Sequence, residues 1–245
     1  MASDYSYIGE NLDIIREKIN KAERNRDNKY NSGKVKLLAV TKTVGAEKIN
    51  FAVSRGVNLI GESRVQELLA KYDKLDRDNL GIHFIGSLQT NKVKYIIDKV
   101  SLFQSVNSVR LAEEINKRAS QHNIKADILI EVNICGEESK TGIDGNGGRV
   151  TEFIKSLKDF DNLRIKGLMT IPPPPGKLEE NEILKVFGRI HEIFLDMQSK
   201  KTDNTDNTET DINILSAGMS EDFERAIAFG SNMVRIGSAL FGKRL

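Results

Sequence analysis

The sequence has one cysteine, three histidines, four prolines and no tryptophan among its 245 residues. Because the single cysteine, Cys135, cannot form an internal disulfide, we expect the reducing environment of the cytoplasm. No apolar run approaches the roughly 18 residues of a membrane helix, and residues 1–7 lack the basic-then-apolar layout of a signal peptide. Neither sign of charge dominates, since 37 basic and 35 acidic residues give a net charge of +2. The sequence therefore predicts no nucleic-acid and no membrane partner.

Histidine, cysteine and carboxylate residues do not recur at metal-ligand spacing, so we expect no metal site. We interpret His83 as a structural histidine and Cys135 as a small buried residue. The four prolines are consecutive, at 172–175, and indicate a stiff loop edge. Residues 200–211 are polar and of low complexity, which is typical of a disordered loop insertion.

Eight apolar, strand-like runs alternate with segments of helical periodicity, and this alternation favours a parallel sheet of the α/β class. The count of eight fits a closed TIM-type (β/α)8 barrel, with an open doubly wound sheet as the alternative. An extra N-terminal helix is expected over residues 6–26, where apolar residues recur every three or four positions. We expect one domain spanning 1–245, with strands at 35–43, 58–63, 82–87, 102–108, 126–134, 163–171, 212–217 and 233–240.

The first of these strands ends in a lysine, Lys42. Because side chains alternate along a strand, Leu38, Val40 and Lys42 share one face. If that face points into the core, burial lowers the lysine pKa, as Schiff-base chemistry with an aldehyde requires. A lysine that caps the strand and reaches into solvent is the alternative.

The last two strands are followed by serines and glycines. Residues 216–220 read Ser-Ala-Gly-Met-Ser, and Arg235, Gly237 and Ser238 come from the final strand. Barrels often bind phosphate with the loops after strands seven and eight. Glu221 and Asp222 argue against an anion there unless both point away.

Closure of a barrel would place Lys42 beside this serine- and glycine-rich region. A ligand with both an aldehyde and a phosphate fits the arrangement, and pyridoxal 5′-phosphate (PLP) is such a molecule. Arg235 would then face the ring or the phosphate as a fixed cation.

Six motifs in one order make the chain similar to the pyridoxal phosphate homeostasis proteins. They are 39–43 (Ala-Val-Thr-Lys-Thr), 61–67 (Gly-Glu-Ser-Arg-Val-Gln-Glu), 83–89 with Asn91 and Lys92, 138–142 (Glu-Ser-Lys-Thr-Gly), 215–220 and 234–237. The resemblance implies a fold-type-III PLP barrel like the N-terminal domain of alanine racemase. It also implies a cofactor-binding lysine at Lys42, phosphate contacts at Ser216, Ser220, Gly237 and Ser238, and cofactor contact by Arg235. The chain departs from the family pattern at Ser63, where asparagine is usual, and at Val44 and Gly45, where a proline is common.

We therefore expect a monomeric, non-catalytic PLP protein that buffers the cofactor or delivers it to apo-enzymes. Lys140, in the loop after the fifth strand, would be a solvated lysine or a second cofactor-handling site. A racemase-like enzyme is the alternative, but it needs a catalytic tyrosine from a second domain, and none of the five tyrosines falls at an expected strand end. A sugar-phosphate barrel enzyme, with Lys42 as an aldolase-type lysine, is a third hypothesis.

Overall fold

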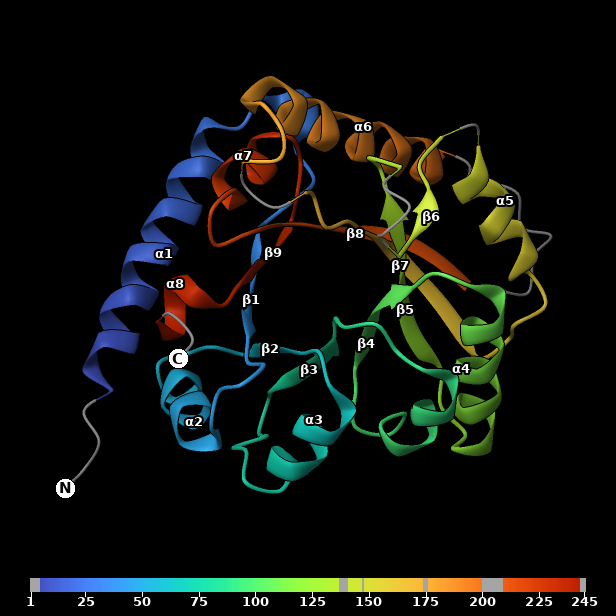
Figure 1. The fold of residues 1–245 in the computed structure, drawn as a ribbon, viewed down its shortest axis with the longest axis horizontal. Helices are drawn as coiled ribbons and strands as arrows, with labels where there is room; N and C mark the ends of the chain where they lie inside the picture. Colours follow the sequence, from blue (N-terminus) through green and yellow to red (C-terminus); the bar gives the residue numbers. More distant parts are fainter. Residues whose placement is uncertain (1–4, 137–140, 147, 174–175, 200–208, 243–245) are drawn as a thin grey trace.

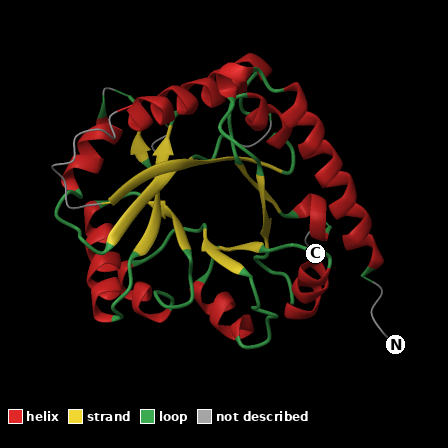
Figure 2. Ribbon diagram, turned by 180° about the vertical axis from the view of Figure 1, so that it is seen from behind, coloured by secondary structure: helices red, strands yellow, loops and turns green. Residues whose placement is uncertain are grey.

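The computed structural model describes residues 5–136, 141–146, 148–173, 176–199 and 209–242. Eight parallel strands form a ring in the order β4-β3-β2-β1-β9-β8-β7-β5, and the pairing of β4 with β5 closes it. Helices surround this barrel (Figure 1, Figure 2). The expected (β/α)8 barrel is confirmed, and the open doubly wound sheet is excluded. The barrel strands are β1 (Lys36–Val40), β2 (Leu59–Glu62), β3 (Gly81–Phe84), β4 (Leu102–Val106), β5 (Ala126–Asn133), β7 (Leu163–Met169), β8 (Glu209–Met219) and β9 (Met233–Ile236).

The helices lie between the strands and the solvent. They are α1 (Ser6–Asn25), α2 (Ala46–Ser54), α3 (Val65–Tyr72), α4 (Val109–Gln121), α5 (Arg149–Ser156), α6 (Glu180–Ser199), α7 (Phe223–Ala228) and α8 (Ser238–Phe241), with short 3-10 helices η1 (Asn28–Tyr30) and η2 (Thr90–Tyr95). The expected N-terminal helix is α1, and its stripe of Ile8, Leu12, Ile15 and Ile19 is buried. It packs against α7 and α8, near the opposite end of the chain (Figure 1). Within the described residues, no helix is long and apolar enough to span a membrane.

Two apolar layers result from the alternation of side chains along the strands. Residues such as Ala39 and Ile60 belong to the large core between the barrel and its helices. Inside the barrel, Leu102, Leu129 and Met169 form a separate cluster with Ile214 packed on it. The interior is thus partly apolar, and polar residues fill the rest of it.

Several element boundaries differ from those expected. Strand β1 ends at Val40, so Lys42 follows the strand instead of ending it. The last strand stops at Ile236, because Ser238–Phe241 forms α8. Strand β8 begins at Glu209, which places the last three residues of the expected loop insertion (200–211) in the sheet, while 200–208 lie outside the described residues. Pairing with Arg164 and Ile165 of β7 extends this polar stretch as strand.

Two further features were missed. A two-residue strand, β6 (Ile143–Asp144), pairs with the end of β5 and lies outside the ring of eight. Between β3 and β4 the chain forms η2, a 3-10 segment, where the strand–helix alternation predicted an α-helix.

Candidate functional site

Lys42 lies in a tight turn just beyond β1. The Val44 amide donates a hydrogen bond to the Thr41 carbonyl (3.0 Å), so Lys42 occupies the second position of a four-residue turn. Thr43, at the third position, has a φ of 64°, which β-branched residues rarely adopt. The Thr43 amide donates to Glu67 Oε2 (2.8 Å), a contact that offsets part of this strain. The turn is therefore held in a single conformation around a half-buried Lys42.

A buried ion pair holds both ends of this turn. Lys71 Nζ donates to the carbonyl oxygens of Thr41 (2.9 Å) and Val44 (3.1 Å), and to Glu62 Oε1 (2.9 Å). The Thr41 hydroxyl donates to the same carboxylate oxygen. Glu62 has no exposed surface, and burial raises the pKa of its carboxyl, although Thr41 and Lys71 oppose the shift. Lys71 thus ties the turn that carries Lys42 to the end of β2.

The position of Lys71 in the sequence indicates a buried lysine, which the sequence analysis did not predict. Val65, Leu68 and Leu75 are buried and recur on one face of the segment that contains α3, and Lys71 falls on the same face. A lysine within an apolar stripe is rarely buried unless a carboxylate pairs with it. Glu62, which belongs to the expected strand 58–63 and to the motif at 61–67, is that carboxylate.

A pocket of about 480 Å³ opens beside the turn. Lys42, Gly237 and Ser238 line it together with Val40 and Phe241. Its volume falls in the range of about 300–1,000 Å³ that is usual for small-ligand sites. A Cβ atom at Gly237 would stand 3.3 Å from Val40 Cβ, so glycine lets the two strands approach closely where the pocket begins. The closed barrel therefore brings the lysine of the first strand and the Gly-Ser pair of the last one together, as the sequence predicted.

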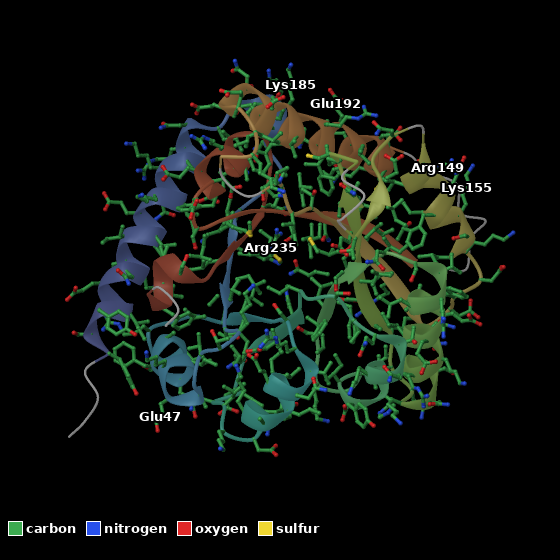
Figure 3. All side chains as sticks on the ribbon, viewed as in Figure 1. Glu47, Arg149, Lys155, Lys185, Glu192 and Arg235 are labelled. Atoms are coloured by element: carbon green, nitrogen blue, oxygen red, sulfur yellow. The ribbon has the colours of Figure 1, made fainter. Side chains whose placement is uncertain are left out.

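Tyr5 also lines this pocket, which our interpretation of the tyrosines did not foresee. The packing of α1 against α8 brings the start of the helix to the pocket, and the Tyr5 hydroxyl donates to Glu47 Oε2 (3.0 Å) on α2. Figure 3 shows Glu47 on α2, at the same side of the molecule as the start of α1. No local pattern in the sequence could have indicated this contact, because it depends on how the two ends of the chain pack.

The loop after β8 reaches the same region through Ser220. Its hydroxyl oxygen accepts hydrogen bonds from the amides of Gly237 (3.4 Å) and Ala239 (3.3 Å). Of the two acidic residues that follow, Glu221 is exposed. Asp222 Oδ1 accepts a hydrogen bond from the Met219 amide (2.5 Å), and burial raises the pKa of this carboxyl. The Asp222 carboxylate is thus bound to the backbone of its own loop.

The other two expected site residues, Ser216 and Arg235, are buried inside the barrel. Figure 3 shows Arg235 near the centre of the molecule. Arg235 donates from NH1 to Ser216 Oγ (2.8 Å) and from NH2 to the Thr170 carbonyl (2.7 Å). Burial lowers the pKa of Arg235 to about 10, and Asp222 and Glu131 oppose the shift, so the guanidinium stays charged at neutral pH. The six expected residues therefore form a pocket group (Lys42, Gly237, Ser238, with Ser220 beside it) and an interior pair.

The remaining residues singled out from the sequence lie elsewhere. His83 is buried and hydrogen-bonded to Gln104 inside the barrel. Cys135 is only partly buried, so its interpretation as a buried residue was wrong. Lys140 lies outside the described residues, and so do two of the four prolines. Among the residues that the structure describes, no three His, Cys, Asp or Glu side chains are grouped to hold a metal ion.

Comparison with known proteins agrees with this geometry. The family model described as "Alanine racemase, N-terminal domain" matches residues 11–244. A curated relative from Aquifex aeolicus (strain VF5), named pyridoxal phosphate homeostasis protein, is 41% identical over 239 residues, which cover 96% of this chain and 97% of the relative.

Two solved structures share the fold. PipY from Synechococcus elongatus, solved with PLP bound, has a TM-score of 0.80 at 28% sequence identity. The matched region covers 96% of this chain and 100% of the PipY chain. An alanine racemase from Clostridium difficile 630 has a TM-score of 0.71 at 18% identity, over 95% of this chain and 57% of the racemase, and shows likeness of fold alone. By sequence and by fold, then, the chain belongs to the pyridoxal phosphate homeostasis protein family and carries the alanine racemase N-terminal domain.

Proposed function

We propose that this protein binds PLP, holds it as a Schiff base on Lys42 and takes part in intracellular PLP homeostasis, by buffering the cofactor or delivering it to apo-enzymes. The observation that carries the proposal is that Lys42, Gly237 and Ser238 line one and the same pocket. The relative from Aquifex aeolicus is named for PLP homeostasis, and PipY was solved with PLP bound, which supports the same cofactor here.

The residues present fit this cofactor. PLP supplies an aldehyde and a phosphate, and the pocket offers an amine on one wall and a glycine and a hydroxyl on the other. With PLP bound, the neutral amine of Lys42 would bond to the aldehyde carbon, and the aldehyde oxygen would leave as water with the two amine protons. Gly237 allows close approach of the backbone to phosphate oxygens, and Ser238 and Ser220 supply hydroxyls. Arg235 provides a fixed positive charge deeper in the barrel, and Ser216 holds it.

Reduction with borohydride tests the covalent link. We expect it to fix a pyridoxyl group on Lys42, and Lys42→Ala to remove the label while the protein stays folded. Lys48→Ala is the matched control, because Lys48 lines the same pocket and should leave the label on Lys42. A label found mainly on another lysine in peptide maps of the wild-type protein would refute the assignment.

The alternative, a racemase-like enzyme, has one observation in its favour: Tyr5 lines the pocket with Lys42. We nevertheless propose a non-catalytic role, because the Tyr5 hydroxyl is engaged with Glu47 and the named relatives are homeostasis proteins. We expect the PLP-loaded protein to restore activity to a cofactor-free acceptor enzyme without exchanging the α-proton of L-alanine in D₂O. Exchange of this proton at ordinary enzyme rates, on the order of 1–10³ per second, would contradict the non-catalytic role. Loss of that exchange in Tyr5→Phe would establish a racemase-like enzyme instead.

We further propose that the protein acts as a monomer in the cytoplasm. Sedimentation velocity of the PLP-loaded protein tests the first point, with a single species of about 27 kDa expected from the chain mass of 27.4 kDa. Fractionation of the source cells tests the second. A dimer that persists on dilution would contradict the proposed monomer.

A further inference from the structure

A line of buried polar side chains crosses the barrel interior from β3 to β9. His83 Nδ1 lies 2.9 Å from Gln104 Nε2, and Gln104 Oε1 accepts a hydrogen bond from the Ser216 hydroxyl at 2.8 Å. Ser216 Oγ in turn accepts from Arg235 NH1 at 2.8 Å. All four residues are at most 5% exposed. They come from four strands, so only the closed barrel brings them together.

Arg235 fixes the direction of every hydrogen bond in this line. A guanidinium only donates, so Ser216 Oγ must accept from it and must give its own proton to another group. That group is Gln104 Oε1, which places the amide nitrogen of Gln104 on the side of His83. Gln104 Nε2 therefore donates, and His83 Nδ1 accepts. Burial lowers the pKa of His83 to about 4, in agreement with a neutral imidazole. The proton of this imidazole then lies on Nε2, because Nδ1 is the acceptor.

Burial of these four polar side chains costs free energy of desolvation, and the neighbouring interior positions are apolar. The hydrogen-bonded line therefore calls for a functional explanation. Leu102, Leu129 and Met169 fill the same space without any need for partners. A buried polar group that loses its partner destabilises the fold, so a wholly apolar interior would be the simpler solution. The two attachments of Arg235, to Ser216 and to the Thr170 carbonyl, together fix the plane of its guanidinium. Because Gln104 Oε1 accepts the Ser216 proton, the hydroxyl is oriented with its lone pairs toward Arg235.

We propose that Gln104 and His83 are positioning residues, which act through Ser216 to hold Arg235 in the orientation that cofactor binding requires. This inference rests on the proposed PLP function and extends its site by two residues. His83 opens one of the sequence motifs, but neither the resemblance nor the pocket gave His83 or Gln104 a role in the site. His83, interpreted as merely structural, is the far end of the line.

The test is a double-mutant cycle read out by PLP affinity and by the visible absorption maximum of the bound cofactor. Gln104→Met keeps the length of the side chain but removes the hydrogen bonds of the amide to His83 and Ser216, together with its contact to Met233 Sδ (3.2 Å). We expect it to weaken PLP binding about tenfold, the factor that corresponds to one hydrogen bond, and to shift the absorption maximum. In an Arg235→Met background, the same change should alter neither quantity further.

Ser105→Ala is the matched control, because Ser105 is the next residue on β4 and is also buried, but its hydroxyl donates to the Gly86 carbonyl. It should change the affinity less than twofold. An equal loss from Gln104→Met in both backgrounds, or no loss in the wild-type background, would overturn the proposal. Should Gln104→Met fail to fold, Gln104→Leu replaces it in the cycle with the same expectations, because it also removes the amide.

A measurement without cofactor separates this proposal from the proposed function. Nitrogen NMR of the imidazole should show His83 protonated on Nε2 and not on Nδ1 at neutral pH. A proton on Nδ1 would overturn the deduced direction even if PLP binds. Absence of PLP binding in the wild-type protein would refute the proposed function and the positioning role together, while the NMR result would still report the hydrogen-bond line by itself.

Discussion

At the scale of single residues, the geometry of the Lys42 turn depends most on Lys71. It is the partner of a fully buried carboxylate, Glu62, and it holds two carbonyl oxygens of the turn. Removal of one partner of a buried ion pair leaves an uncompensated charge, which typically costs about 3–5 kcal/mol. We predict that Lys71→Met lowers the free energy of unfolding by this amount in urea titrations.

Lys74→Met is the control for this prediction, because Lys74 is exposed and lies one helical turn further along the chain. It should change the free energy of unfolding by less than about 0.5 kcal/mol. Replacement of both charged partners, in Lys71→Met with Glu62→Gln, should restore part of the loss. An unchanged stability of Lys71→Met would contradict the role that we assign to the pair.

The second prediction at this scale concerns the pH dependence contributed by His83. Burial lowers its pKa from 6.5 to about 4 in the folded protein, and nearby Lys36 adds to the shift. The unfolded chain therefore binds more protons between these values, and the stability present above pH 6.5 is lost as the pH falls toward 4. The full loss amounts to about 3 kcal/mol.

Unfolding free energies at pH 7 and pH 4.5 should show this loss in the wild-type protein and less of it in His83→Gln, which cannot titrate. The raised pKa values of Glu62 and Asp222 act in the opposite sense, and both variants share them. His122→Gln, at an exposed position, should keep the wild-type pH dependence. Identical pH dependence in wild type and His83→Gln would contradict this prediction.

At the scale of elements, the end of β8, from which the chain turns toward α7, depends on Gly218. Its φ is +91°, and a Cβ atom there would stand 2.6 Å from Ala226 Cβ and 2.9 Å from Phe223 Cα. Gly33 has a similar φ of +89° but open space around it, which makes it the matched control. We predict that Gly33→Ala costs about 1–2 kcal/mol from backbone strain alone.

Gly218→Ala should cost more than Gly33→Ala, because the collision adds to the strain. It should also weaken PLP binding, because it shifts the loop in which Ser220 accepts a hydrogen bond from the Gly237 amide. Thermal unfolding and PLP titration of the two variants measure both effects. Equal losses of stability in Gly218→Ala and Gly33→Ala would mean that the neighbours of Gly218 move aside without loss of free energy, which would contradict this prediction.

The sequence predicted element types better than element ends. Runs of β-branched and aliphatic residues indicated all eight barrel strands, because strands buried on both faces need apolar side chains throughout. The end of β1 was missed because Thr43 is neither glycine nor asparagine, the residues that usually mark a positive φ. The start of β8 was missed because polar residues there extend the strand by pairing with β7.

The candidate site was predictable where it follows from topology. A closed barrel places its first and last strands side by side, and this alone predicted that Lys42 would lie near Gly237 and Ser238. Tyr5 and Gln104 could not be found in that way. Their contacts depend on how α1 packs and on which interior side chains meet, and neither leaves a local pattern in the sequence.

At the scale of the whole molecule, binding of PLP should stabilise the fold by mass action. A ligand that binds only the folded protein adds about 2.7 kcal/mol at 100 times its dissociation constant. We predict that the melting temperature rises with PLP concentration in the wild-type protein and rises less in Lys42→Ala. Lys48→Ala should follow the wild-type protein, since Lys48 lines the pocket without an assigned role. An equal rise in all three proteins would indicate binding at another place.

The pocket draws Lys42 from the first barrel strand and Gly237 and Ser238 from the end of the last one. A ribosome synthesises the lysine 195 residues before Gly237. A nascent polypeptide therefore carries a reactive amine without the wall that faces it, and it cannot capture the cofactor in this pocket. If PLP binds in this pocket as proposed, only a molecule whose barrel has closed can take it up, so a loaded molecule is evidence of a folded one.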